Sequence, residues 1–313
     1  MEGKDLLSVS DLGSEDICLL IQDAVDMKTR GWLSVLSGKT LALVFEKPSL
    51  RTRVSFELAM RQLGGESVYL SPDEVGLGKR EAVSDAARVL SRYVDAIAAR
   101  TFSHQTLEVL AGYSSVPVIN ALSDLEHPCQ ALADLFTIYE KKSELAGLNV
   151  AFVGDGNNVA HSLMLATSLM GMNFRIASPA DYRVQKGIMN LAQGYAVASG
   201  AEILCTEEPQ QAVSGADVVY TDAWASMGQE NEAQERRQVF SGYQVNSELL
   251  SLAKNDAILM HCLPAHRGEE VSESILDSPQ SVVFEQAENR LHMQKALLVM
   301  ILGGLEIPLA GYR

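Results

Sequence analysis

The chain has 313 residues, of which 47% are hydrophobic and 21% charged, and its formal net charge is −15. This length allows two ordinary domains, and the composition is that of a globular protein with a buried core rather than of a disordered chain. The negative charge argues against a nucleic-acid or acidic-membrane partner, because both need a basic face to neutralise phosphates. An anionic substrate must therefore be held by a locally basic pocket.

The cysteines and the N-terminal segment both predict a cytoplasmic protein. Cys18, Cys129, Cys205 and Cys262 are far apart and show neither a CxxC pair nor the density of a disulfide-stapled domain. The N-terminal MEGKDLLSVSDLGSEDICLL carries acids and lacks the continuous apolar run of a signal peptide. No stretch reaches the roughly 18 consecutive apolar residues of a membrane span.

Short apolar runs alternate with longer amphipathic stretches from about Lys39 onward, which is the pattern of parallel α/β sheets. The expected strands are 40–45, 67–70, 96–99, 117–120, 149–153, 174–177, 217–221 and 257–261. Helical spacing is found at 53–64, 82–93, 130–141 and 159–170. We therefore expect an α/β fold with two domains, each a mainly parallel sheet flanked by helices.

The charged turn KKSELAG predicts the domain junction, because it ends one helix and precedes the fresh apolar strand LNVAFVG. The two domains would then comprise residues 1–142 and 143–313. A last helix at about 289–302 is apolar enough to be buried. We expect this segment, 289–313, to return to the first domain.

The first group of residues with chemical meaning follows the first predicted strand, where Ser49, Leu50, Arg51 and Thr52 lie at a helix start. Backbone N–H groups at a helix N-terminus favour anions, and the hydroxyl and guanidinium groups of KPSLRTR add donors suited to phosphate. A capping turn with solvated arginines is the alternative. Pro48 and the dense Ser-x-Arg-Thr-Arg grouping favour a phosphate site.

The segment HPCQ predicts a second group of ligands at a strand end. Pro128 suits the first turn of a helix, so that His127 and Gln130 can face the same opening. A lone histidine near a helix start is more often a cap or a satisfied core group, and the segment alone leaves both interpretations open.

The run VAFVGDGNNVAHS looks like a dinucleotide fingerprint, since Gly154 and Gly156 follow a strand and open a helix. The third glycine position holds Val159, however, and no acid lies at a clear strand end about twenty residues on. A nicotinamide dehydrogenase is therefore a poor alternative, and we expect no cofactor.

Two later segments carry groups suited to an amino-acid substrate or to a metal. In YTDAWASMG, Asp222 can bind an α-ammonium group, and Ser226 with the backbone of Met227 can complete recognition of the head group; an ordinary acidic loop is the alternative. HCLPAHRGEE gathers histidine, cysteine and glutamate as a zinc site does. These residues follow one strand end, and no second Cys/His cluster exists in the sequence, so we predict no metal.

Together these segments resemble the aspartate and ornithine carbamoyltransferases. KPSLRTR resembles the carbamoyl-phosphate signature of that family, and RYVDAIAAR, DLEHPCQALADL, DAWASMG and HCLPAHRGEEV follow in the family's order over nearly the whole chain. The resemblance implies that residues 1–142 bind carbamoyl phosphate and residues 143–313 bind ornithine, whose side-chain amine receives the carbamoyl group to give L-citrulline and phosphate. It also implies a homotrimer, or a multiple of trimers, with each site near a subunit interface.

The resemblance assigns roles to residues of this chain. The carbamoyl-phosphate ligands it implies are Ser49, Leu50, Arg51, Thr52, Arg100, His127, Gln130, Cys262, Leu263 and Arg290. The implied ornithine ligands are Asn158, Asp222, Ser226 and Met227. The implied catalytic residues are Arg51, Arg100, His127, Cys262 and Asp222.

The chain departs from the family at SPDEVGLGKRE, where Gly76 stands at a position that is glutamine in several members. Lys79 or Arg80 could supply compensating charge in this loop. The alternatives are a sister enzyme acting on aspartate, putrescine or an acylated ornithine, and a catalytically silent subunit with the same fold. An aspartate site should need extra cations where this chain has Asp222, and a putrescine site would leave Ser226 and Met227 idle.

Overall fold

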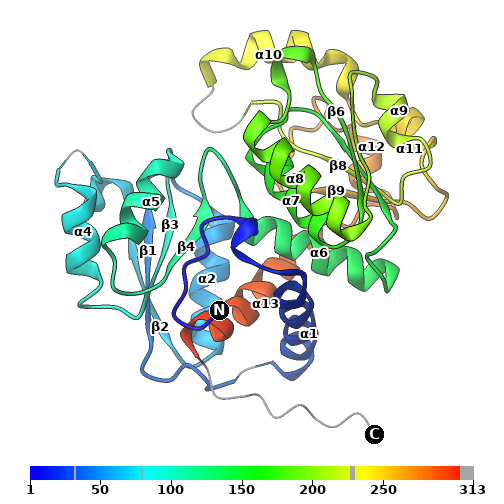
Figure 1. Ribbon diagram of the computed structural model, residues 1–313. Helices are drawn as coiled ribbons and strands as arrows, with labels where there is room; N and C mark the ends of the chain where they lie inside the picture. Colours follow the sequence, from blue (N-terminus) through cyan, green and yellow to red (C-terminus); the bar gives the residue numbers. More distant parts are fainter. Residues whose placement is uncertain (32, 79, 226–229, 304–313) are drawn as a thin grey trace, which may run out of the picture. The chain divides into compact units, whose positions relative to one another are not determined.

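The computed structural model describes residues 1–31, 33–78, 80–225 and 230–303 (Figure 1). Contacts divide the chain into two units. The first unit comprises Met1–Asp124 together with the C-terminal segment from Arg290, and the second comprises Leu125–Asn289. Among the described residues, no helix combines the length and apolar composition needed to cross a membrane.

The first unit contains a parallel sheet with the strand order β2-β1-β3-β4. Its strands are β1 (Thr40–Phe45), β2 (Glu66–Leu70), β3 (Ala96–Arg100) and β4 (Val118–Leu122). The helices before β4 are α1 (Ser14–Arg30), α2 (Leu50–Gln62), α3 (Pro72–Val75), α4 (Val83–Leu90) and α5 (His104–Tyr113). Apolar residues of β1 and β3 pack with residues of α4 and α5, which buries that face of the sheet.

The second unit contains a parallel sheet with the order β7-β6-β5-β8-β9. Its strands are β5 (Asn149–Val153), β6 (Asn173–Ala177), β7 (Ile203–Thr206), β8 (Val218–Thr221) and β9 (Ile258–His261). The helices are α6 (Pro128–Lys142), α7 (Asn158–Leu169), α8 (Lys186–Ser199), α9 (Pro209–Val213), α10 (Ala233–Val239), α11 (Ser247–Leu250) and α12 (Glu273–Leu276). The last helix, α13 (Val283–Leu302), begins in this unit and belongs to the first unit from Arg290.

Each sheet has a point where the chain reverses its direction of winding. In the first unit β2 lies on one side of β1 while β3 and β4 lie on the other, so the reversal falls between β1 and β3. In the second unit it falls between β5 and β8. Ligands of open α/β sheets bind outside the carboxyl ends of the strands at such points.

The last helix returns to the first unit, as the sequence predicted. From Arg290 onward α13 belongs to that unit, and Figure 1 shows this part beside α1 and α2. The buried Lys295 donates a hydrogen bond from Nζ to the carbonyl oxygen of Met27 at 3.0 Å, and the N–H of Gly3 donates to the carbonyl of Ile301 at 3.0 Å.

Every strand expected from the sequence is present, and the two-domain α/β fold is confirmed. Strand β7 and the helices α1, α5 and α8 were not predicted, nor were the short helices α3, α9, α10, α11 and α12. The expected junction after residue 142 stays a prediction: contacts group α6 with the second unit, whereas the charged turn that motivated the junction follows this helix.

We predict that Leu297→Ala lowers the free energy of unfolding by about 2–5 kcal/mol, because Leu297 is fully buried on α13 and its truncation leaves a cavity. The matched control is Phe284→Ala in the first turn of the same helix. Phe284 is 64% exposed, so its truncation should change stability by about 0.5 kcal/mol or less. Urea unfolding of both variants gives the measurement, and equal losses would contradict the burial of α13.

Candidate active site

The strand β1 leads into the N-terminus of α2 at the segment predicted to bind phosphate. Ser49 is the N-cap residue: its Oγ accepts from the N–H of Thr52 at 3.4 Å and lies 3.0 Å from Thr52 Oγ1, to which it donates. Arg290, on α13, donates from Nη2 to the same Thr52 Oγ1 at 2.8 Å. The first turn of α2 thus presents oriented hydroxyl groups, with the buried guanidinium of Arg290 beside them, at a helix N-terminus of the kind that favours anions.

Arg100 lies at the end of β3, the neighbour of β1, and stands opposite Phe45 in the strand register. The N–H of Glu46 donates to its carbonyl oxygen at 2.8 Å, so the two strand ends remain joined. Arg100 is only 7% exposed. Its side chain therefore holds a positive charge at the winding reversal of the first sheet.

Lys47 is a cationic neighbour that the sequence analysis missed, although it stands two residues before Ser49. Its Nζ lies 5.0 Å from the centroid of the Phe102 ring. Burial and the nearby Arg100 lower the pKa of Lys47 to about 8, against the opposing influence of Asp124 and Glu46. A lysine with a lowered pKa beside a buried arginine at a strand end suits an anionic ligand.

The second arginine of Ser-x-Arg-Thr-Arg points elsewhere. Arg53 donates from Nε to Glu57 at 2.8 Å, and its guanidinium lies 3.8 Å from the centroid of the Tyr69 ring. It is spaced four residues from Glu57 on an exposed helix face, where such pairs form readily. The sequence predicted two guanidinium groups at this anion site. One of them, that of Arg53, instead pairs with Glu57 on the surface.

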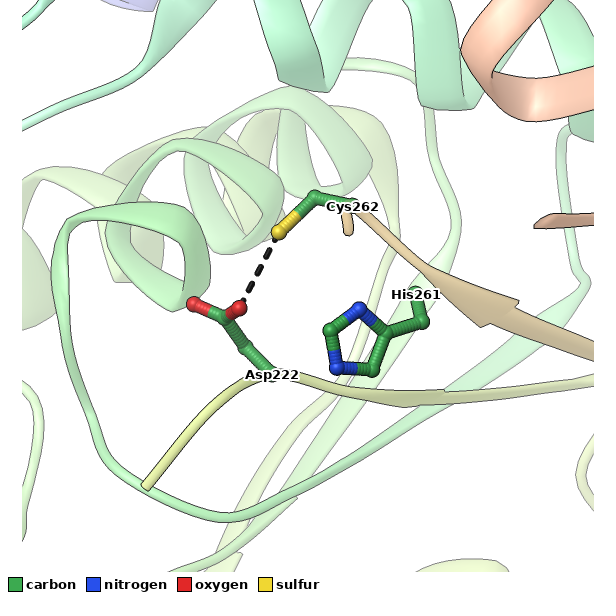
Figure 2. Close-up of side chains that lie close together, drawn as sticks. All are labelled: Asp222, His261 and Cys262. Carbon is green, nitrogen blue, oxygen red and sulfur yellow. Dashed lines mark hydrogen bonds between the residues drawn. The ribbon is translucent and has the colours of Figure 1, made fainter. Parts of the chain in front are cut away.

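In the second unit, Asp222 follows β8 and is held by two neighbours from adjacent strand ends, of which Figure 2 shows Cys262. Cys262, after β9, donates from Sγ to Asp222 Oδ1 at 3.0 Å. Asn157, after β5, donates from Nδ2 to Asp222 Oδ2 at 2.8 Å. Both donors are neutral side chains, so they orient the 9%-exposed carboxylate without cancelling its negative charge.

Asn157 was missed by the sequence analysis, which chose its neighbour Asn158. Its Oδ1 caps α7 by accepting from the N–H groups of Val159 and Ala160 at 3.0 and 3.1 Å. Asn158 is the first residue of α7 and is half-buried. The same amide thus sets the start of α7 and the orientation of Asp222, a double role typical of a residue that supports a ligand site.

His261 fixes the turn that carries Cys262 and Leu263. Its Nδ1 accepts from the N–H of Leu263 at 2.8 Å, so the proton lies on Nε2, which donates to Glu270 Oε1 at 3.1 Å. Leu263 has φ 58°, a left-handed conformation that is uncommon for leucine. The fully buried His261 stabilises this unfavourable backbone through its hydrogen bond to the N–H of Leu263.

The ligand atoms of Asp222, His261 and Cys262 lie within 4.8 Å of one another, close enough to suggest a metal site (Figure 2). Both ring nitrogens of His261 are already engaged, however. A metal ion at this cluster would have to break the hydrogen bond to Leu263 or the one to Glu270. The thiol of Cys262 and the carboxylate of Asp222 are therefore better suited to contact an amine than to bind a metal ion.

At the start of α6, His127 is the N-cap residue, yet its side chain makes no capping bond. Its N–H donates to Ser162 Oγ at 2.8 Å, and Ser162 in turn donates to Glu126 Oε2 at 3.0 Å. Pro128 occupies the first turn, as predicted. The capping interpretation of this histidine is therefore wrong, and its backbone is fixed by a buried chain of hydrogen bonds.

The glycine run after β5 does not present the open loop that a dinucleotide needs. The N–H of Gly156 donates to the carbonyl of Tyr182 at 2.8 Å, and a Cβ at Gly156 would lie 2.3 Å from the N of Val184. Backbone of the segment 182–184 therefore packs against the glycine at the place where a pyrophosphate would approach.

Arg236, on α10, anchors the chain that follows Asp222. Its Nη1 donates to Asp155 Oδ2 at 2.7 Å and to the carbonyl of Trp224 at 2.9 Å. Burial raises the pKa of Asp155, and the hydrogen bond from Arg236 opposes this shift. Ser226 and Met227, two of the predicted ornithine ligands, lie outside the described residues, as does Lys79 of the loop that departs from the family.

Arg80 lies in the described part of that loop and donates from Nη1 to the carbonyl oxygen of Glu74 at 3.3 Å. Gly76 ends α3 in a left-handed conformation with φ 50°. A glycine meets this backbone requirement without strain, which gives a structural reason for the residue found there.

Comparisons with known proteins identify a family whose two domains bind ligands of the kind that these side chains suit. Residues 4–140 match the family model described as "Aspartate/ornithine carbamoyltransferase, carbamoyl-P binding domain", and residues 146–301 match the "Asp/Orn binding domain" of the same family. The ornithine carbamoyltransferase of Hyperthermus butylicus is 56% identical over 96% of this chain and 98% of its own. That of Bacillus subtilis is 54% identical over 96% of this chain and 94% of its own.

The solved structure of ornithine carbamoyltransferase from Pyrococcus furiosus superimposes with a TM-score of 0.94 at 51% identity, covering 97% of this chain and 99% of that one. Fold, strand-end residues and sequence similarity over almost the full length therefore lead to the same result. This chain belongs to the aspartate/ornithine carbamoyltransferase family.

Proposed function

We propose that this protein transfers the carbamoyl group of carbamoyl phosphate to the side-chain amine of L-ornithine, giving L-citrulline and phosphate. The observation that carries the choice of amine is the carboxylate of Asp222, oriented by the neutral donors Asn157 and Cys262. This group suits an ammonium cation. A substrate with two carboxylates, such as aspartate, would meet the same negative charge.

The first unit supplies the groups suited to the phosphate. Ser49, Thr52 and the N–H groups of α2 donate hydrogen bonds, while Arg51 and Arg100 neutralise charge. Leu50, the first residue of the same helix, is a further proposed ligand of carbamoyl phosphate. Arg290, held on Thr52, is suited to the carbamoyl group. Since phosphate is a good leaving group, positioning and charge stabilisation suffice, and no covalent nucleophile of the enzyme is required.

In the reaction, the neutral amine nitrogen attacks the carbonyl carbon and a C–N bond forms. Negative charge develops on the carbonyl oxygen, where Thr52, Arg100 and His127 stabilise it, while Gln130 and the carbonyl of Leu263 take the amide end. The bond from that carbon to the phosphate oxygen then breaks. The departing phosphate accepts the proton of the amine, so a dedicated general base is unnecessary.

Asn158, Asp222, Ser226 and Met227 would recognise the α-carboxylate and α-ammonium of ornithine, and Cys262 would lie beside the reacting amine. We also propose that residues 1–142 and 143–313 divide the two substrates between them. The family resemblance further supports a homotrimer or a multiple of trimers, and the scattered cysteines support a location in the cytoplasm.

The test of this function is the incubation of the purified protein with carbamoyl phosphate and L-ornithine. Citrulline and phosphate should form in equal amounts, with neither product above background when ornithine is left out. A protein that binds carbamoyl phosphate but forms no citrulline would instead be the catalytically silent subunit considered from the sequence.

We predict that Arg51→Ala lowers kcat/KM by about 10²–10³-fold, because it removes a charged donor from the phosphate site. Arg53→Ala is the matched control, since Arg53 lies on the same helix but is paired with Glu57. This control should stay within about threefold of the parent, as a surface pair contributes about 0–1 kcal/mol. Equal activities of the two variants would remove the anion-site assignment of Arg51.

Lys47 should make carbamoyl phosphate binding dependent on pH. Its pKa of about 8 in the free protein means that Lys47 is protonated below this pH and neutral above it. A bound phosphate dianion favours the protonated form, so the dissociation constant should rise as the pH passes upward through about 8. Titration calorimetry between pH 7 and 9.5 measures the effect.

Lys47→Met should bind more weakly at pH 7 and lose this part of the pH dependence, whereas Lys47→Arg should bind without a transition in this range, because arginine stays protonated. A transition that persists unchanged in Lys47→Met would assign it to another group.

Asn157→Ala should raise the KM for ornithine about tenfold or more, because a hydrogen bond to a charged group contributes about 1.5–3 kcal/mol and Asp222 loses one. The KM for carbamoyl phosphate should be unchanged. Asn246→Ala is the control, since Asn246 caps α11 by accepting from the N–H of Leu249 at 2.9 Å. Both variants should lose about 1 kcal/mol of stability with the helix cap. In steady-state kinetics, only Asn157→Ala should raise the KM for ornithine.

A further inference from the structure

A buried chain of hydrogen bonds in the second unit connects two groups of proposed ligands. On α6, Gln130 donates from Nε2 to Asp134 Oδ1 at 2.8 Å. Gln286, in the first turns of α13, donates from Nε2 to the same oxygen at 2.7 Å. The N–H of His261, at the end of β9, donates to Gln286 Oε1 at 2.9 Å. All four residues are at most 1% exposed.

The direction of the Gln286 amide follows from its neighbours. The backbone N–H of His261 is a donor, so the group that faces it must be the oxygen Oε1. The amide nitrogen then faces the side chain of Asp134 and also donates to the hydroxyl oxygen of Tyr220 at 3.0 Å. One side chain thus serves both an acceptor on α6 and a donor on β9, and an amide does both at once without a change of protonation.

The chain continues beyond His261 to the proposed ligands that follow it. His261 holds the left-handed Leu263 through its Nδ1, and Cys262 lies between these two residues. A displacement of the His261 backbone would therefore move the thiol of Cys262 and the carbonyl of Leu263. A displacement of Asp134 would release the amide of Gln130.

We infer that Gln286 and Asp134 are positioning residues that link Gln130 on α6 to the turn 261–263 after β9, so that these ligands of carbamoyl phosphate and ornithine keep a fixed mutual geometry. This inference rests on the proposed function. The sequence offers no sign of it, because Gln286 and Asp134 are 152 residues apart. Neither residue belongs to the ligand set assigned above, and both act through residues that do.

Three variants test this link through Gln286 and Asp134, which we call the bridge. Gln286→Leu removes all three side-chain hydrogen bonds of Gln286 and should lower kcat at least tenfold. Gln286→Glu keeps an acceptor for His261 but directs its second oxygen at Asp134 Oδ1, so the two carboxyl groups must share a proton. Burial keeps the pKa of the facing Tyr220 well above its ordinary value, so its hydroxyl stays neutral. The activity of Gln286→Glu should then fall as the pH rises, in a range where the parent is constant.

The double variant Asp134→Asn/Gln286→Glu leaves a single carboxyl group in place of two facing ones, so no proton has to be shared and the added pH dependence should be lost. The matched control is Gln280→Leu. Gln280 donates from Nε2 to the carbonyl of Ala257 at 3.1 Å, beside the opposite end of β9, and this variant should keep the kcat of the parent. A merely structural role of Gln286 would lower stability in all variants without moving the pH profile.

A second readout needs no turnover. In a background of Cys18→Ser and Cys205→Ser, which removes the two exposed thiols, the alkylation rate of Cys262 by iodoacetamide reports on the turn 261–263. Gln286→Leu should change this rate several-fold, and Gln280→Leu should leave it unchanged. A parent that forms no citrulline would defeat the proposed function, while the alkylation rates would still judge the bridge. Parental alkylation in Gln286→Leu together with a parental pH profile in Gln286→Glu would overturn it.

Discussion

The constraint on which this molecule depends is the alignment of parallel strands, which brings the carboxyl ends of all strands in a sheet to one edge. Each sheet also reverses its winding once, between β1 and β3 in the first unit and between β5 and β8 in the second. In open α/β sheets, ligands bind outside the carboxyl ends of the strands at such reversals. Ser49 and Arg100 lie at the first reversal, and Asn157 and Asp222 at the second.

The groups proposed to bind the two substrates carry opposite charge. The chain as a whole has a net charge of −15, yet the edge of the first sheet gathers Lys47 and Arg100, which lie close enough for one to lower the pKa of the other. The edge of the second sheet presents Asp222, supported by neutral donors. An anionic and a cationic substrate are thus each provided with a complementary strand end, and this separation explains how an acidic protein can recognise carbamoyl phosphate.

Much of this arrangement could be predicted from the sequence, because it depends on local patterns. The start of α2 follows from Ser49 as an N-cap, and that of α6 from Pro128 in its first turn. The edge strand β7 was missed because it has only four residues and none of them is fully buried, so it lacks the apolar pattern of the other strands. The start of the last helix was predicted too late, at about 289, whereas α13 begins at Val283. The buried residue Gln286 is polar, so this first part of the helix lacks the apolar pattern on which the prediction depended.

The supporting residues of the site could not be predicted, because their roles arise from contacts between distant parts of the chain. Asn157 meets Asp222 across 65 positions, and Gln286 meets Asp134 across 152. A sequence pattern reports neither contact. Lys47 is different, because it belongs to the motif KPSLRTR and its positive charge next to the anion site is visible in the sequence.

The central claim is that the carboxylate of Asp222 selects a cationic amino-acid substrate. The most direct measurement is kcat/KM for a panel of amines with saturating carbamoyl phosphate: ornithine, acetylornithine, putrescine and aspartate. The account predicts that ornithine is preferred by at least 10²-fold over each of the others, since unpaired buried polar groups penalise a substrate that lacks the matching charge. Equal or better use of acetylornithine, whose α-amine carries no charge, would contradict the role given to Asp222.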